Sequence, residues 1–228
     1  MESKILIFDA SSLISIAMNG LLPELKELKK IFLGRFIIPE EVKWEIIDRP
    51  INIKKFELEA LKLNELLNEG VLELPEVLGI KKEEISKKTE KLLDITNNTF
   101  FEKGKKEIHL IDLGETACLI LSKILNEKKI KNILVIDERT TRLICEKPEN
   151  LKKLLQKKMH TKIDIKRENL KEFKEFKIVR STELIYIAYK KNLVKIKNPK
   201  ILDALLYALK FKGCAISTEE IKTIKKLG

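Results

Sequence analysis

Two acidic residues that directly follow short apolar segments are the side chains of this sequence best placed for catalysis. Asp9 follows the segment Lys4–Phe8, and Asp137 follows a second segment of the same pattern at 131–136. A short run of consecutive apolar residues is typical of a strand buried on both faces of a parallel sheet. Because ligands of open parallel sheets bind outside the carboxyl ends of the strands, both acids are expected at one functional edge.

Further acidic residues can join these two. Glu45 lies on a helix predicted after a second strand at 36–38, and Glu115 lies in the first turn of a predicted helix that begins after Asp112. Asp112 can instead cap that helix, with Glu115 at its third position. Gly114 would let another part of the backbone approach closely at this point. The candidate catalytic and metal-binding residues are therefore Asp9, Glu45, Glu115 and Asp137, with Asp112 and Glu138 as alternates.

Carboxylates that are brought together repel one another unless a cation or a bound proton compensates their charge. The donor type predicts a hard divalent ion, one or two Mg2+ or Mn2+. Such ions lower the pKa of an attacking water and stabilise the charge that develops when a phosphodiester is cleaved. No acid-x-acid pair follows the first strand, which disfavours an aspartyl-phosphate phosphatase. The absence of a glycine-rich phosphate loop disfavours an NTPase or dinucleotide enzyme, and the spacing of His109 and His160 disfavours a zinc site.

Four residues near these acids are candidates for contact with a phosphate-bearing substrate. Ser11 can bond a phosphate or a metal-bound water, or it can simply cap the first helix. Guanidinium groups bind phosphate through two parallel hydrogen bonds, and the chain has only six arginines. A surface ion pair is the alternative explanation for each of these arginines. The predicted substrate-binding residues are Ser11, Arg139, Arg142 and Arg180.

The charge of the chain favours a polyanionic partner. Its 228 residues carry a formal net charge of +11, and lysine supplies almost all of the excess. This gives RNA a favourable long-range field. Lysine and glutamate enrichment is also typical of proteins from thermophiles, and an AT-rich genome would favour the same lysine codons. No stretch approaches the roughly 18 apolar residues that span a bilayer, so we expect a cytoplasmic protein without a membrane partner.

Strands that alternate with helices predict an α/β fold with a central, mainly parallel sheet flanked by helices. The core is expected at about 1–48 and 109–194. A helical insertion with a short strand at 71–74 is expected at about 49–108, and helices are expected in the C-terminal tail at about 195–228. The lysine-rich block 147–176 is irregular and is expected to contain a helix at 151–158. We found no internal repeat or low-complexity linker, and therefore expect a single domain over 1–228.

Four segments together resemble the PIN-domain family of metal-dependent nucleases, in particular a longer, decorated member of archaeal type. They are ILIFDASSLI, IPEEVKWEI, DLGETACLIL and LVIDERTTRLI, which contain the four candidate acids in order. The segment IVRSTELIYIAYKKNLV is similar to the closing element of that fold. The resemblance implies a PIN-like three-layer sandwich, one or two Mg2+ or Mn2+ and cleavage of single-stranded RNA. It also implies a homodimer and an antitoxin or RNA-processing partner protein.

The expected function is therefore a metal-dependent endoribonuclease that hydrolyses RNA phosphodiester bonds at a site of four carboxylates. In this prediction Asp9 and Asp137 bind the metal directly, while Glu45 and Glu115 complete the ligand set or hold metal-bound water. The alternative is a non-catalytic RNA- or protein-binding module in an RNA-processing assembly. A structure-specific DNA nuclease would share the same residues.

Overall fold

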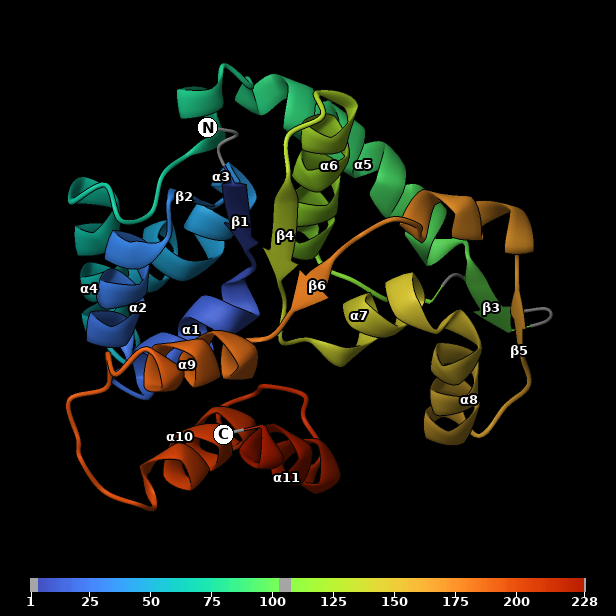
Figure 1. Ribbon diagram of the computed structural model, residues 1–228. Coiled ribbons are helices and arrows are strands. Elements are labelled where there is room, and N and C mark those ends of the chain that lie inside the picture. Colours follow the sequence, from blue (N-terminus) through green and yellow to red (C-terminus); the bar gives the residue numbers. More distant parts are fainter. Residues whose placement is uncertain (1–3, 103–107, 228) are drawn as a thin grey trace.

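A parallel sheet of four strands forms the centre of the structure, a computed structural model that describes residues 4–102 and 108–227 (Figure 1). The strand order is β2 (Gly34–Ile37), β1 (Lys4–Phe8), β4 (Asn132–Val135) and β6 (Ile178–Val179). Every pairing in this sheet is parallel, so all four carboxyl ends lie at one edge. The predicted α/β class with a parallel sheet is confirmed, and the first predicted strand has the observed bounds.

Helices cover both faces of the sheet. The connection from β1 to β2 contains α1 (Ala10–Met18) and α2 (Leu22–Ile31), while α6 (Leu113–Glu127) leads into β4 on the opposite side of β1. Since these two crossovers run in opposite directions along the sheet, their right-handed sense puts their helices on opposite faces. The helix α9 (Ser181–Lys190) packs on α1 and α2, and α5 (Lys82–Asn97) packs on α6. The arrangement is a three-layer α/β sandwich (Figure 1).

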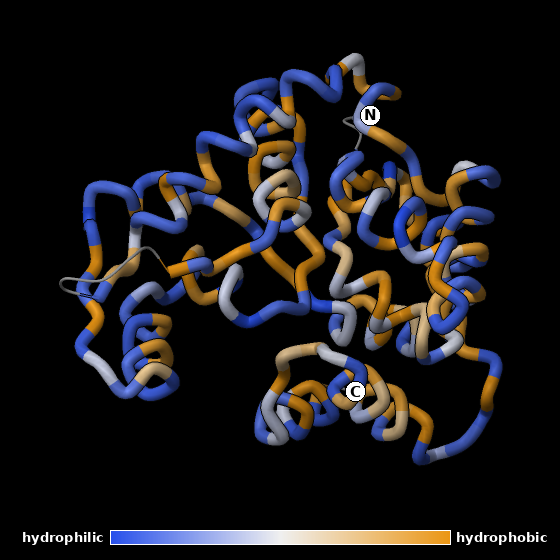
Figure 2. Tube along the Cα trace, turned by 180° about the vertical axis from the view of Figure 1, so that it is seen from behind, coloured by the Kyte–Doolittle hydropathy of each residue, from blue (hydrophilic) through white to orange (hydrophobic). Residues whose placement is uncertain are grey.

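The core follows from the apolar strands. Ile7 and Phe8 in β1 and Leu134 and Val135 in β4 are fully buried, as expected for central strands covered on both faces. Figure 2 shows hydrophobic residues concentrated along the central strands, while the outer helices alternate between hydrophobic and hydrophilic positions. Buried apolar side chains in mutual contact extend from Ile5 to Ile224.

The region between the second and third candidate acids contains helices, as expected, and also a strand at a place where none was expected. A strand β3 (Phe100–Glu102) pairs antiparallel with β5 (Ile163–Ile165) and forms a second, two-stranded sheet. The sequence did not predict β3 or β5, because each strand has three residues, too few to show an alternating pattern. The strand expected at 71–74 is reduced to a bridge between Glu73 and Ile37.

The other elements of the insertion are helical. In its described residues, α5 is accompanied by η2 (Pro50–Asn52), α4 (Glu57–Asn68) and η3 (Pro75–Leu78). The helix α3 (Glu40–Lys43) and the π-helix η1 (Trp44–Asp48) directly precede the insertion.

The part of the chain after β6 is helical, as the sequence predicted. The helix α10 (Ile201–Phe211) packs on α9 and on α11 (Thr218–Lys226), below α9 in Figure 1. A capping box begins α11: the Ser217 N–H donates to Glu220 Oε2 at 2.8 Å, and the Glu220 N–H donates to Ser217 Oγ at 3.1 Å. No helix in the described residues is both long enough and apolar enough to cross a membrane. The segment between β4 and β6 contains α7 (Arg139–Glu146), α8 (Pro148–Met159) and η4 (Arg167–Phe173).

Candidate active site

Asp9 lies where β1 ends and α1 begins, and it is almost fully buried. Its Oδ2 accepts hydrogen bonds from the backbone N–H of Ser11 at 3.1 Å and from the Ser11 hydroxyl at 2.5 Å. Its Oδ1 is buried and has no hydrogen-bond partner. A buried carboxylate oxygen without a partner is costly, because the desolvation of its charge is not compensated. This oxygen is therefore available to a proton or a cation.

Glu45 reaches the same edge of the sheet from the π-helix η1. A single turn of π-helix within a longer helical segment re-aims side chains and is frequent at functional sites. Glu45 Oε1 accepts a hydrogen bond of 3.1 Å from the N–H of Gly114 in the first turn of α6. A Cβ atom at residue 114 would lie 2.8 Å from Oε1, so glycine is required for this close approach. The predicted close approach at Gly114 exists, but a side chain makes it rather than a backbone.

Glu115 lies in the first turn of α6, whose N-cap is Asp112. Glu115 is 8% exposed, and its Oε2 accepts the N–H of Asp112 at 3.0 Å. The side chain of Asp112 is exposed and contacts His109 Nε2 at 2.8 Å. Glu138 is the N-cap of α7 and accepts the N–H of Thr141 at 2.9 Å. Of the two alternates, Asp112 thus lies on the surface and Glu138 caps a helix.

Electrostatic interactions show which of these acids act on one another. Burial raises the pKa of Asp9 to about 6. Burial and then the charge of Asp9 raise the pKa of Glu45 to about 7. Burial, followed by the charges of Asp9 and Glu138, raises the pKa of Glu115 to about 9. The charge of Asp9 thus makes ionisation of both Glu45 and Glu115 more costly, as the charge of Asp137 does for Asp9, and Asp9 is the common member of one interacting cluster. We call Asp9, Glu45 and Glu115 the carboxylate cluster.

Asp137 follows β4 at the same edge but has a different environment. Its Oδ1 accepts the N–H of Ser181 at 2.7 Å, and its Oδ2 accepts the Ser181 hydroxyl at 2.6 Å. The side chain is fully buried, and this burial raises its pKa although the two bonds from Ser181 oppose the shift. Its backbone N–H donates to Ser11 Oγ at 3.3 Å. The Asp137 carboxylate therefore links the end of β4 to the start of α9 through its two hydrogen bonds with Ser181.

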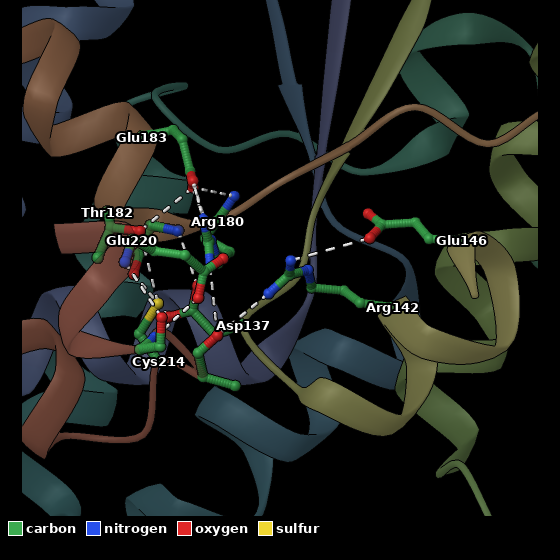
Figure 3. A network of polar contacts seen from close by, with 11 residues as sticks. Asp137, Arg142, Glu146, Arg180, Thr182, Glu183, Cys214 and Glu220 are labelled. Atoms are coloured by element: carbon green, nitrogen blue, oxygen red, sulfur yellow. Dashed lines mark hydrogen bonds and ion pairs between the residues drawn. The ribbon is translucent and has the colours of Figure 1, made fainter. Parts of the chain in front are cut away.

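Arg180 belongs to a network of ion pairs that joins α9 to the C-terminal helices (Figure 3). Its side chain is 9% exposed, and Nη2 contacts Glu183 Oε1 at 2.5 Å while Nη1 contacts Glu220 Oε1 at 2.8 Å. Against the effect of burial, bonds from Ser217 and Arg180 lower the pKa of Glu220 to about 2. The structure thus favours the ion-pair alternative for Arg180 over phosphate binding.

The three remaining predicted substrate contacts differ in their exposure and in their partners. Arg139 is exposed at the start of α7. Arg142 is half-buried, donates to the backbone oxygen of Ala215 at 3.2 Å and lies 3.9 Å from Glu146 (Figure 3). Ser11 does not cap α1, whose N-cap is Asp9, and its hydroxyl donates instead to Asp9 Oδ2. Arg139 is therefore the most accessible of the three side chains.

The donor set of the carboxylate cluster fits a hard divalent cation, and the unpartnered Asp9 Oδ1 provides a free ligand atom. No group of three acidic, histidine or cysteine side chains in residues 4–102 and 108–227 already has the arrangement of a metal site. The carboxylates are thus neighbours that interact electrostatically, without the geometry of bound ligands.

Sequence reasoning missed two contributors to this site. Ser181 was not among the candidate site residues, yet it donates hydrogen bonds to both carboxylate oxygens of Asp137. Glu41 lies one helical turn before Glu45 and adds to the negative charge around it. The four-residue spacing between the two glutamates on a predicted helix was the signal for Glu41. Comparison of the chain with protein-family models, with curated proteins and with solved structures gave no match.

Proposed function

We propose that this protein is a divalent-metal-dependent nuclease that hydrolyses phosphodiester bonds of single-stranded RNA. The observation that carries the proposal is the carboxylate cluster with its unpartnered, buried Asp9 Oδ1 at the carboxyl ends of a parallel sheet. The resemblance of its sequence segments to PIN domains and the net charge of +11 support RNA as the substrate.

In this proposal Asp9, Glu45 and Glu115 hold the ion, and Glu138 supplies further negative charge beside Glu115. Mg2+ or Mn2+ held by these residues would lower the pKa of a water and stabilise charge on the phosphate. Asp137, which the sequence led us to expect as a direct ligand, is proposed instead as a positioning residue, because Ser181 already occupies both of its oxygens.

The test is cleavage of mixed single-stranded RNA and DNA in Mn2+, Mg2+ or EDTA by the wild-type protein and Asp9→Asn. The matched control is Asp94→Asn, which makes the same change at an exposed position of α5. We expect cleavage of RNA that requires the metal, is reduced about 100-fold or more in Asp9→Asn and is unchanged in the control.

Metal-dependent cleavage that persists in Asp9→Asn would contradict the assigned site. Cleavage of DNA alone would replace RNA as the substrate. Salt-sensitive RNA binding without cleavage in either metal would favour the non-catalytic binding module.

A further inference from the structure

An apolar pocket adjoins the carboxylate cluster and shares Glu45 with it. Its volume is about 290 Å3, and its walls come from α1, η1, η2 and α4. Ile14 and Met18 on α1 lie three and seven residues after Ser11 and therefore continue the helix face on which Ser11 contacts Asp9. The pocket and the proposed reaction site thus share Glu45 and the helix α1.

The insertion after the second candidate acid supplies the opposite wall. Phe56 is 39% exposed and Ile53 is 38% exposed at the mouth of the pocket, and the buried Ala60 and Leu63 lie among its lining residues. Exposed aromatic and aliphatic side chains that surround a hollow are unusual unless something covers them. This wall gives the insertion a direct role beside the site.

Three charged side chains also line the pocket. Glu45 and Glu59 provide hydrogen-bond acceptors, and Arg49 provides donors. The Arg49 guanidinium lies 5.6 Å from the ring centroid of Trp44, which is 53% exposed. An apolar side chain of a partner protein would leave these three charges unmatched, whereas the edge of a nucleobase carries both donors and acceptors.

We propose that this pocket takes one unpaired nucleobase of single-stranded RNA, next to the phosphate that lies at the carboxylate cluster. The inference rests on the proposed function and adds a subsite to it. The pocket volume of about 290 Å3 is close to the smallest ligand pockets, which have about 300 Å3. A pocket of this size suits one flat ring system. Phe56 offers a stacking surface, and the positive net charge holds the flanking backbone.

The test measures binding in EDTA, so that it does not depend on cleavage. The probes are a fluorescently labelled single-stranded RNA and an oligonucleotide of the same length and charge whose sugars carry no bases. We expect the wild-type protein to bind the RNA at least about fivefold more tightly than the abasic probe, as base stacking on protein side chains requires. Phe56→Ala and Ile14→Ala should each reduce that ratio and leave the affinity for the abasic probe unchanged.

Leu58→Ala is the matched control, because Leu58 is 58% exposed on α4 and does not line the pocket. It should retain the wild-type ratio. Equal affinity of the wild-type protein for the two probes would overturn the inference, as would a pocket variant that behaves like Leu58→Ala. Either result would leave the pocket to an apolar group of a protein partner. A base-dependent ratio in a protein that never cleaves RNA would support the pocket while contradicting the nuclease, so the two failures are distinguishable.

Discussion

Gly114 has no side chain, and the carboxylate of Glu45 occupies the space that one would fill. In Gly114→Ala the new methyl group must displace the Glu45 carboxylate, which is the flexible end of a long side chain. The fold should therefore be retained, with a gain of about 0.5–1 kcal/mol because alanine loses less backbone entropy in a helix. The affinity for Mn2+, measured by calorimetry, should fall about tenfold as the bond from the Gly114 N–H is lost.

Leu113→Ala, at the exposed neighbouring position, is the control and should bind Mn2+ as the wild type does. A folded Gly114→Ala variant with unchanged affinity would show that Glu45 is not a ligand.

The carboxylate cluster also predicts how stability depends on pH without metal. The pKa values of Asp9, Glu45 and Glu115 are raised in the folded protein to about 6, 7 and 9. The folded state therefore keeps protons that the unfolded chain has released, and stability falls as pH rises through these values. In EDTA, Tm should decrease from pH 5 to pH 8, and Mn2+ should raise Tm more at pH 8 than at pH 5.

Thermal unfolding of Asp9→Asn provides the comparison. Because this variant removes the first charge of the cluster, its Tm should depend less on pH than that of the wild type, while Asp94→Asn should follow the wild type. A wild-type Tm that increases over the same range would refute the description of the three acids as one cluster.

At the level of whole elements, the ion pairs of Arg180 connect the start of α9 to α11 (Figure 3). Arg180→Met should lower the free energy of unfolding by about 3 kcal/mol, because it leaves Glu183 with no cation in a largely buried position. Urea denaturation measures this loss. Arg167→Met removes an exposed ion pair with Glu149 and should change stability by about 1 kcal/mol or less. Reduced RNA cleavage with unchanged stability in Arg180→Met would instead restore its predicted role in phosphate binding.

The helices and strands differ in how well the sequence predicts them. The strand β1 was predictable because its apolar residues are consecutive and an acid ends them. The pairing of β3 with β5 was not, because two three-residue segments about 60 positions apart carry no local pattern. The π-helix that carries Glu45 is also invisible in the sequence, since one widened turn changes the hydrogen bonds and not the composition.

For the site, the sequence predicted position better than orientation. It placed Asp9 and Asp137 at the carboxyl ends of strands at one edge of the sheet, and the structure has them there, on strands that pair with each other. The direction of the Asp137 side chain depends on Ser181, 44 residues later, which only the folded chain brings into contact.

For the molecule as a whole, the net charge of +11 predicts salt-sensitive binding of single-stranded RNA. Each phosphate contact contributes a slope of about −0.7 to the dependence of log K on log salt. With about five contacts, the affinity in EDTA should fall about 100-fold between 50 and 200 mM salt. Fluorescence anisotropy measures this slope. RNA binding that is independent of salt would show that lysine side chains do not contact the RNA phosphates.

The position of β1 in the middle of the sheet also has a consequence in time. During synthesis β1 can pair with β2 as soon as residue 37 has emerged, but its other edge waits for β4 at 132–135. At typical rates of translation this interval is on the order of ten seconds. During this interval one edge of the hydrophobic strand β1 is unpaired and can pair with another chain, so binding of a chaperone would protect the nascent protein from aggregation. Glu115 is also far along the chain, so no complete carboxylate cluster exists until about half of the protein has been made.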